Sequence, residues 1–505
     1  MRPLHVANKI LSKKETLLTL PLPKDRGRVA SLGPKKAVQA QSIGQERPCR
    51  LFGARLRVCA LSLLLFVFCV GCASTEERLS LGRQGDALVP AINKAANPYS
   101  WPDAPPADCT FEASTDIVGI TFTGRYANYT GADTFYLAWA SDGDCYSPWT
   151  DGYVWTDRKQ EPLDCSYCNV AYKYKRKLLG LQKGSPLPED RYLYHCHSNV
   201  APTCTGQMRI TGDSPLDLEF EVLGKMYSGM ALYPCVSVIA DDVFYIGTYS
   251  AFEDGGRFNG FRYSSDWGHW AEEVEPGWTN PYWTDTRSAK TDFFKTDRGP
   301  RRFNVPHAVV FGQNNSLSPD GKIYLTAHGQ IEHGKSNWDK GDAVYLCRVN
   351  AAPEAVVNPE AHEFFAGHAA DGNAQWSNNV QESQPILEWK NHLGSESITY
   401  IPPLKKFLLM TARLKEAEEN LPYNVLVFWE ADRVTGPYRM VHYLRDWGPQ
   451  TYFPNIPAKF IGEDGKTLWL CVSSNYSQKA TPNPFGCRYA ASFHELTLNL
   501  AEKNK

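Results

Sequence analysis

The sequence predicts an all-β fold, a five-bladed β-propeller with a Cys-rich insertion in its first blade. Short stretches rich in β-branched and aromatic residues recur from about residue 111 onward, each bounded by Gly, Pro, Asn or Asp; this is the pattern of strands joined by turns. Tight-turn sequences occur among them five times, and no long stretch has the apolar period of a helix. A large β-sandwich is the alternative that these observations leave open.

The predicted strands are short, and many of them lie next to a turn sequence. They span residues 117–124, 217–224, 243–249, 307–312, 322–329, 343–349, 397–401, 406–412, 424–431, 457–462 and 467–474. Their β-branched and aromatic side chains favour a pleated, half-buried surface. We therefore expect them to pair into antiparallel sheets.

Five turn sequences divide this part of the chain into repeats. They are centred on Asp142-Gly143, Asp241-Asp242, Asp320-Gly321, Lys405 and Asp464-Gly465. Asp-Gly supplies the positive φ that a two-residue hairpin needs. The turns are 59 to 99 residues apart, which is longer than a minimal blade of about 40–50 residues. We expect five blades that carry loop insertions.

The propeller is predicted to span residues 109–498, so the first 108 residues lie outside it. Residues 1–50 are basic and lack a hydrophobic period, as expected of a non-structural extension or a start codon placed too early. Residues 51–72 are typical of a lipoprotein-type signal peptide. Their apolar run at 58–71 is shorter than the about 20 residues of a transmembrane helix. The Pro-rich residues 73–108 are predicted to be a tether.

The end of the apolar run resembles a bacterial lipobox, in which a small residue precedes a Cys that becomes lipidated. Here Gly71 precedes Cys72, while Cys69 stands where Leu is usual. The match predicts an exported lipoprotein of the bacterial cell envelope, in the periplasm or at the outer membrane or cell surface. A short signal anchor or a buried helix is the alternative.

Cysteine usage agrees with export. Ten of the 14 Cys follow Cys72, and an even count in an exported chain predicts disulfides. Residues 157–210 interrupt the strand pattern and hold Cys165, Cys168, Cys196 and Cys204. Two disulfides fit these four residues, and a zinc site that also uses the neighbouring His residues is the alternative.

The charge and the aromatic content restrict the kinds of partner. The net charge is −2 and 21% of residues are charged, so we expect no nucleic-acid partner. The 14 Trp and 26 Tyr fit a β-rich core, and they also fit sugar binding, where aromatic faces cover the C–H patches of a pyranose ring. We expect the chain to be a monomer.

A set of short motifs resembles five-bladed propeller glycosidases, the group of arabinanases, β-xylosidases and levansucrase-type enzymes, and more closely their uncharacterised bacterial lipoprotein relatives. The motifs follow one another along residues 110–498. They are WASDGD (139–144), YSPWTDG (146–152), FGQN (311–314), SPDGK (318–322), EW (388–389), TY (399–400), DRVTGPY (432–438) and YFPNIPAKF (452–460). The resemblance implies a glycoside hydrolase-like protein that acts on a polysaccharide or oligosaccharide.

Glycoside hydrolysis needs two carboxyl groups across the scissile bond, and the resemblance implies that they lie on inner strands of different blades. Asp133 precedes the stretch TFYLAW and is the expected base, whereas Glu396 precedes SITYI and is the expected acid. Asp151 and Glu382 are the alternatives. Each of these carboxylates also fits a structural role at a turn or on an exposed strand.

Further residues are expected to bind the substrate. They are Trp139, Trp149, Asp151, His307, Asn314, Trp389, Tyr452 and Asn455. Core packing is the alternative for the aromatic residues and for His307. The arabinanase pattern has an Asp in the third blade, whereas HAVVFGQNN (307–315) contains none. A non-catalytic propeller lipoprotein that binds a glycan or a protein is therefore the alternative function.

Motifs for other chemistries are absent from the sequence. It has no Gly-rich phosphate loop after a strand, no GxSxG elbow and no HExxH spacing. We expect no cofactor, although the resemblance allows a calcium ion on the propeller axis.

Overall fold

The computed structural model describes residues 91–101, 104–156, 192–196, 204–227, 232–250, 255–269, 282–287, 292–295, 299–332, 337–414, 423–474 and 487–502. The chain divides into two compact units, Met1–Glu76 and Glu77–Lys505, and all described residues belong to the second unit. The predicted extension, the predicted signal peptide and Cys72 lie outside the described residues. Within the described part, no helix is both long and apolar enough to cross a membrane.

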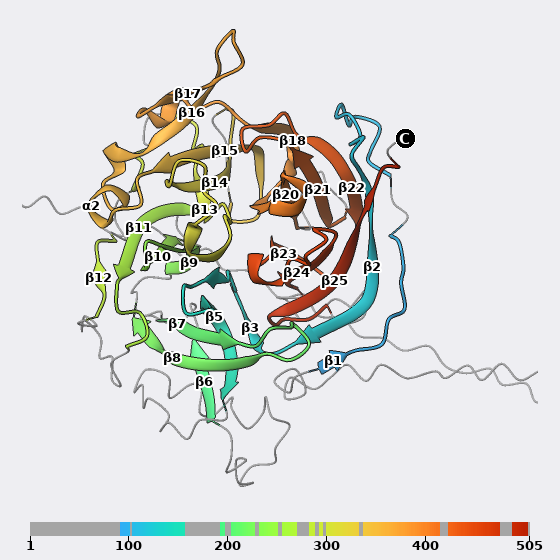
Figure 1. The fold of residues 1–505 in the computed structure, drawn as a ribbon. Helices are drawn as coiled ribbons and strands as arrows, with labels where there is room; N and C mark the ends of the chain where they lie inside the picture. The colour runs from blue at the N-terminus through green and yellow to red at the C-terminus, as the bar shows by residue number, and fades with distance from the viewer. Residues whose placement is uncertain are drawn as a thin grey trace, which may run out of the picture. The chain divides into compact units, whose positions relative to one another are not determined.

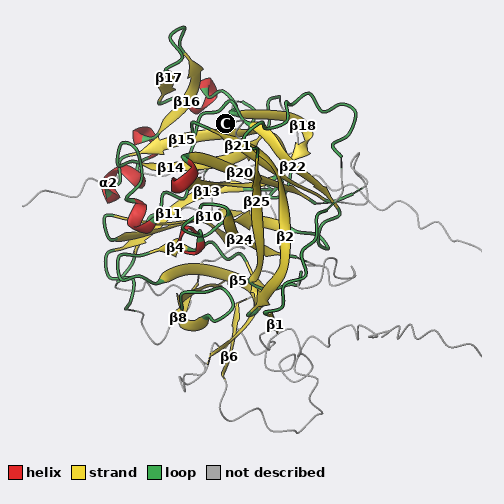
Figure 2. Cartoon of the chain, turned by 45° about the vertical axis from the view of Figure 1, so that its right-hand side comes forward, coloured by secondary structure: helices red, strands yellow, loops and turns green. Residues whose placement is uncertain are grey.

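The described elements are strands, with only a few short helical turns between them (Figure 2). The strands are β1 (Ala91–Asn93), β2 (Ile117–Asn128), β3 (Gly131–Asp133), β4 (Ala138–Trp139), β5 (Cys145–Thr156), β6 (Tyr192–Cys196), β7 (Cys204–Thr211), β8 (Glu219–Tyr227), β9 (Leu232–Ala240), β10 (Val243–Ser250), β11 (Arg257–Ser264), β12 (Thr284–Asp285), β13 (Asn304–Ala308), β14 (Ile323–Gly329), β15 (Gly341–Val349), β16 (Glu363–His368), β17 (Ala374–Ser377), β18 (Leu387–Leu393), β19 (Ser395–Ile401), β20 (Lys406–Arg413), β21 (Val425–Ala431), β22 (Arg439–Arg445), β23 (Tyr452–Asn455), β24 (Thr467–Ser473) and β25 (Ser492–Leu500). The helical turns are η3 (Gln313–Asn315), α2 (Pro353–Val356), η4 (Pro359–Ala361), η5 (Val380–Glu382), η6 (Pro402–Leu404) and η7 (Ala458–Phe460). The all-β prediction is confirmed.

The strands form antiparallel meanders that follow one another along the chain. The first contains β3 to β8, the second β9 to β12, the third β13 to β18 and the fourth β19 to β22, while the fifth contains β23, β24, β25, β2 and β1. The second and third meanders share one hydrogen-bonded sheet because Arg257 of β11 pairs with Asn304 of β13. Figure 1 shows the meanders around a common centre, with β9, β13 and β23 close to it and β2 and β17 near the rim.

Each predicted turn lies between two consecutive strands of one meander: β4 and β5, β9 and β10, β13 and β14, β19 and β20, and β23 and β24. In each turn at least one central residue has the left-handed backbone that such hairpins need. The φ angles are 92° at Gly143, 48° and 59° at Asp241 and Asp242, 71° at Gly321, 55° at Lys405 and 67° at Gly465. The predicted turns therefore fall where the chain turns from one strand to the next.

The fifth meander is built from both ends of the described chain. Its strand β2 pairs with β25 from Ile117 opposite Leu500 to Asn128 opposite Ser492. An apolar cluster that includes Phe122 of β2 and Met410 of β20 is buried between this meander and the fourth. Residues far apart in the sequence thus hold the first described long strand in place.

Three predicted boundaries differ from the structure. Residues 457–462, predicted to be a strand, contain the helical turn η7, and β23 supplies the strand that pairs with β24. Part of the predicted tether is ordered, because β1 pairs with β2 and Tyr99 stacks on Phe122 with ring centroids 5.2 Å apart. The predicted insertion at 157–210 includes β7, which pairs with both β5 and β8.

The disulfide prediction is not supported by the described cysteines. Cys109, Cys145, Cys235, Cys347, Cys471 and Cys487 are free thiols. All except Cys109 are buried in apolar surroundings, where Cys packs as a small hydrophobic residue. The side chains of Cys165, Cys168, Cys196 and Cys204 lie outside the described residues, so disulfides or zinc at these four stay a prediction.

Candidate functional site

Strands β3, β13, β14, β19 and β23, together with the segment after β3, bring a group of polar side chains to the centre. We call this group the central cluster. It consists of Asp133, Tyr136, His307, His328, Glu396 and Tyr452. Strand β23 links the two carboxyl groups predicted to be catalytic, because Tyr452 donates a hydrogen bond to Asp133 and the Phe453 amide donates one of 3.2 Å to Ser395, the residue before Glu396.

Asp133 is held by a residue of the fifth meander. It ends β3 and is 5% exposed. The hydroxyl of Tyr452, at the start of β23, donates to Asp133 Oδ2 over 2.7 Å. Because this hydrogen bond fixes the carboxyl group against a fully buried ring, Asp133 is oriented in the centre rather than free at a surface turn.

Glu396 lies on β19 and is paired with a histidine of the third meander. Its Oε2 is 2.8 Å from His328 Nδ1, and both side chains are fully buried. Burial raises the pKa of Glu396, although the charge and hydrogen bond of His328 act in the opposite direction. For Glu396 Oε1, the described residues provide no hydrogen-bond partner. A buried oxygen without a partner is costly, and it is the atom through which Glu396 would meet a ligand.

His307 and Tyr136 add two further buried polar groups. Their rings are 4.6 Å apart. Burial, helped by the charge of His328, lowers the pKa of His307 to about 3. Burial is also the main reason that the pKa of Tyr136 is raised. Both groups are therefore neutral at ordinary pH, and neither His307 Nε2 nor Tyr136 Oη has a hydrogen-bond partner in the described part of the chain.

Backbone strain accompanies the central cluster. Thr134, directly after Asp133, has φ 63°, Val305 of β13 has φ 45°, and Phe453, directly after Tyr452, has φ 52°. Positive φ is unusual for residues with a side chain and rarer still for β-branched ones. Strain of this kind persists only where surrounding contacts enforce it, and it is concentrated at functional sites.

Several residues predicted to bind substrate have structural positions instead. Trp149 is fully buried against β7, where a Cβ added to Gly206 would lie 2.2 Å from the indole. Trp389 is buried in an apolar cluster with Trp429. The indole of Trp139 donates to the Gly143 carbonyl over 3.2 Å and closes the first hairpin.

The two Asn residues among the predictions are also structural. Asn314 lies in η3 and accepts a hydrogen bond of 3.1 Å from the Asp242 amide. The amide of Asn455 donates to the Phe135 carbonyl over 3.1 Å, joining the fifth meander to the first. A short polar side chain beside a positive-φ residue is common in turns, and this signal favours the structural interpretation of Asn314.

The alternative carboxylates give no competing site. Glu382 is exposed in η5 and accepts hydrogen bonds from Ser377 and Asn379. These bonds lower its pKa. It was the alternative acid, but it lies outside the central cluster. The side chain of Asp151 is outside the described residues.

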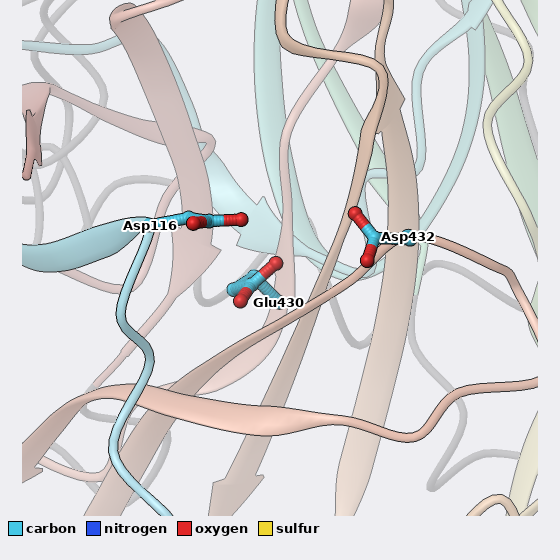
Figure 3. A group of neighbouring side chains, drawn as sticks. All are labelled: Asp116, Glu430 and Asp432. Carbon is cyan, nitrogen blue, oxygen red and sulfur yellow. The ribbon is translucent and has the colours of Figure 1, made fainter. Parts of the chain in front are cut away.

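One group of acidic residues in the described part of the chain has metal-like spacing. Asp116, Glu430 and Asp432 have carboxylate oxygens within 4.8 Å of one another, and Figure 3 shows them converging. The ammonium group of Lys406 lies among them, 3.0 Å from Glu430, 2.7 Å from Asp432 and in contact with Asp116. A lysine therefore supplies the positive charge here. The predicted calcium on the axis stays a prediction.

Sequence reasoning missed His328 and Tyr136. Tyr136 lies three residues after Asp133 in the stretch TFYLAW (134–139), where an aromatic side chain also fits an apolar core. His328 is the next-to-last residue of the predicted strand 322–329. Side chains alternate along a strand, so residues 324, 326 and 328 lie on one face. The signal that could have found it is a titratable residue inside an otherwise apolar strand next to a turn.

The comparisons with known proteins give structural likenesses at low sequence identity. A Bacteroides ovatus protein described as a hydrolase is 12% identical, with 75% of this chain and 90% of that chain covered and a TM-score of 0.39. An α-L-arabinofuranosidase from Podospora anserina, in complex with cellotriose, is 9% identical over 79% and 94% of the two chains, with a TM-score of 0.35. A Cellvibrio cellulosa α-L-arabinanase complexed with arabinohexaose is 11% identical over 58% and 87%, with a TM-score of 0.30.

The arabinanase among them is of a kind that the sequence motifs resemble. Because the TM-scores are below 0.5, we base the function on the residues of the central cluster and not on this likeness. No family model matches the chain, and no curated protein matches it.

Proposed function

We propose that the chain is a five-bladed propeller that hydrolyses a glycosidic bond in a polysaccharide or oligosaccharide, with Asp133 and Glu396 as the reacting pair. The observation that carries the proposal is that β23 links the two buried carboxyl groups, because Tyr452 donates a hydrogen bond to Asp133 and the Phe453 amide donates one to Ser395, the residue before Glu396. Glycosidases need one carboxyl group to protonate the leaving oxygen and a second to act as base or nucleophile. Two carboxyl groups in different surroundings can divide these roles.

Glu396 is the acid in this proposal. Burial, the main cause, raises its pKa, which favours the protonated form that an acid needs. Its Oε1 lacks a hydrogen-bond partner among the described residues and is available to a leaving oxygen. Asp133 is the base or nucleophile, held in position by Tyr452. The Tyr136 ring, whose centroid lies 4.6 Å from that of His307 in the same cluster, would pack against the sugar.

A non-catalytic propeller that binds a glycan or a protein is the second candidate function. One observation favours it: Asp133 and Glu396 are only 5% and 1% exposed, so a substrate must reach carboxyl groups that the protein itself covers. The third meander also lacks, in HAVVFGQNN (307–315), the Asp of the arabinanase pattern.

The N-terminus belongs to the same proposal. We infer that Cys72 is lipidated after export and that the propeller is tethered to the cell envelope as a monomer, where it meets polysaccharide. The support is the apolar run at 58–71, which ends directly before Cys72.

The test is hydrolysis by the full chain and its variants on a panel of plant and algal glycans. Glu396→Gln and Asp133→Asn are each expected to lower the rate by at least about a hundredfold, the contribution of a positioned acid or base, while binding of the same glycan persists. Glu382→Gln, a surface Glu of equal size, is the matched control and should keep full activity. Glycan binding without hydrolysis by the unmutated chain would establish the second candidate instead.

A further inference from the structure

His328 lies between two hydrogen-bond acceptors in the central cluster. Its Nδ1 is 2.8 Å from Glu396 Oε2, and its Nε2 is 2.9 Å from the backbone oxygen of Asn337. Both the His328 and the Glu396 side chains are completely buried. The two ring nitrogens therefore have defined partners on opposite sides.

The chemistry of these partners determines where the protons are. A backbone carbonyl carries no hydrogen, so Nε2 must be the donor in its bond to Asn337. A neutral imidazole has only one N–H. Nδ1 therefore carries a lone pair and no hydrogen, unless the ring is an imidazolium. Either Glu396 Oε2 donates its proton to Nδ1, or Nδ1 of an imidazolium donates to a carboxylate. Both arrangements place a single proton between Nδ1 and Oε2.

We propose that His328 and Glu396 hold this one proton in common, so that the proton given to a substrate is a second one, carried on Glu396 Oε1. The catalytic consequence rests on the proposed function, whereas the shared proton does not. His328 is then a positioning residue: it fixes the Glu396 carboxyl group and prevents the shared proton from reaching the substrate. Oε1 is the oxygen without a hydrogen-bond partner among the described residues.

The acid step balances with this assignment. The Oε1–H bond breaks and its proton moves to the leaving oxygen, as the bond from that oxygen to the anomeric carbon breaks and its electron pair stays on the oxygen. The electron pair of the O–H bond stays on Glu396, which returns to the one-proton state with His328. The Asp133 carboxylate compensates the positive charge that develops on the sugar ring.

The neighbouring titratable groups do not take up the shared proton. They are Asp133 and Tyr136 of the first meander, Cys235 of β9 and His307 of β13. Burial raises the pKa of Tyr136 and of Cys235, and burial lowers the pKa of His307 to about 3. Tyr136, Cys235 and His307 are therefore neutral across the ordinary pH range.

Nitrogen NMR of the full chain labelled with ¹⁵N-histidine tests the shared proton without reference to activity. The His328 signals are assigned by their loss in His328→Gln. We expect Nε2 to stay protonated throughout the pH range in which the fold persists. We also expect Glu396→Gln to move the Nδ1 shift to that of a plain neutral acceptor. A bare Nε2, or an Nδ1 shift that Glu396→Gln leaves unchanged, would overturn the inference.

The pH profile of hydrolysis tests the second proton. A neutral carboxyl group carries only one proton, so when Oε1 is protonated the shared proton is on Nδ1 and His328 is an imidazolium. This cation lowers the affinity of Oε1 for its proton, because a nearby positive charge favours the carboxylate. In His328→Gln the side-chain amide can still donate to Oε2 but carries no charge. The basic limb of the profile should therefore move up by about 1–3 pH units. An unmoved limb in a variant with normal thermal unfolding contradicts the assignment.

The two tests separate failure of the inference from failure of the proposed function. If the chain hydrolyses no glycan but shows the expected Nε2–H and the expected response of Nδ1, the shared proton is supported and the proposed enzyme function is contradicted. If the chain hydrolyses glycan but Nε2 carries no hydrogen, the enzyme function is supported and the shared proton is contradicted. His307→Gln, at the other buried histidine of the cluster, is the matched control. In this variant the nitrogen shifts of His328 should still indicate the same protonation state of its ring.

Discussion

Tyr452 donates a hydrogen bond of 2.7 Å to Asp133, so the last meander of the chain holds a carboxyl group of the first. The outer strands of the fifth meander make a comparable link, because β2 from the N-terminal side pairs with β25 from the C-terminal side. The two ends are therefore joined both at the rim and at the centre. The position of Asp133 depends on this closure as well as on its own hairpin.

Replacing Tyr452 by Phe should disturb Asp133 more than it disturbs the core. The ring and its contact with Trp338, 5.4 Å away, are kept, while the buried oxygen of Asp133 loses its donor. A hydrogen bond to a charged group contributes about 1.5–3 kcal/mol, and we expect the free energy of unfolding in urea to fall by that amount. Glycan hydrolysis should fall as well, since Asp133 is no longer oriented.

Tyr400→Phe is the control for this prediction. Tyr400 is half-buried on β19 and packs against Phe407 with ring centroids 5.0 Å apart, away from Asp133. This variant should change the free energy of unfolding by less than about 0.5 kcal/mol. If Tyr452→Phe is as stable as Tyr400→Phe, the Tyr452–Asp133 bond does not hold the carboxyl group.

Acid should destabilise the fold through histidines that are buried in the neutral form. Burial lowers the pKa of His362 to about 4 and that of His494 to about 3. The ordinary value of about 6.5 applies to the unfolded chain, so the unfolded state binds more protons between these values. The stability is complete above about pH 6.5 and is lost as the pH falls, at up to about 1.4 kcal/mol per pH unit for each group.

His362→Gln isolates one of these contributions outside the central cluster. His362 Nδ1 is 3.0 Å from the Asn358 carbonyl, and the ring lies among Phe261, Phe293 and Phe294. Urea unfolding at a series of pH values should show a shallower loss of stability below pH 6.5 in this variant. His269→Gln, at an exposed position, should keep the slope of the unmutated chain. If the free energy of unfolding depends on pH with the same slope in the two variants, the loss of stability in acid is not due to His362.

Lipidation of Cys72 can be tested in a bacterial host by labelling with a radioactive fatty acid. The full chain should be labelled and should fractionate with membranes. Cys72→Ala should lose both properties because only a Cys at the end of the apolar run can carry the lipid. Cys69→Ala is the matched control, three residues earlier, and should stay labelled. Label that persists in Cys72→Ala would show that the apolar run is a signal anchor or has another role.

Local rules of turn chemistry explain why the repeat could be predicted from the sequence. Asp142-Gly143 and Asp464-Gly465 require a left-handed backbone wherever they form a hairpin, and both have it. The same rules failed at residues 457–462, where Pro457 and the buried Phe460 lead into a helical turn. Apolar content alone does not distinguish such a turn from a strand.

The candidate site could be predicted only in part, because it is assembled from strands of different meanders. Asp133 and Glu396 could be proposed from the sequence because each carboxylate precedes a stretch of apolar residues. Trp149 was assigned to sugar binding, although the structure buries it against Gly206. His328 and Tyr136 were missed because their contacts come from β19 and β13, and these neighbours are set by tertiary packing.

Lys406 is predicted to stabilise the junction of the fourth and fifth meanders. Its ammonium group contacts Asp116 before β2 and both Glu430 and Asp432 of the β21 segment. Of these, Glu430 is buried and also accepts a hydrogen bond of 2.9 Å from Ser114. Lys406→Met keeps the apolar stem of the side chain but leaves three carboxylates together. Because removal of one partner of a buried ion pair costs about 3–5 kcal/mol and two of the carboxylates are exposed, we expect a loss of about 2–4 kcal/mol.

The chemistry of this cluster adds a second readout to the same prediction. Burial opposes the charge of Lys406, but the hydrogen bonds that its ammonium group donates to the three carboxylates raise its pKa. Its contribution is therefore complete below the ordinary lysine value of about 10.4 and is lost only as the pH rises beyond that. In Lys406→Met no ammonium group lies among the three carboxylates, whose oxygens are within 4.8 Å of one another, so calcium can supply the positive charge in its place. Calcium should then raise the melting temperature of the variant more than that of the unmutated chain.

Adding Glu430→Gln to Lys406→Met should recover most of the lost stability, since the buried unpaired charge is removed. A double variant as unstable as Lys406→Met would mean that the lysine acts through its packing and not through its charge.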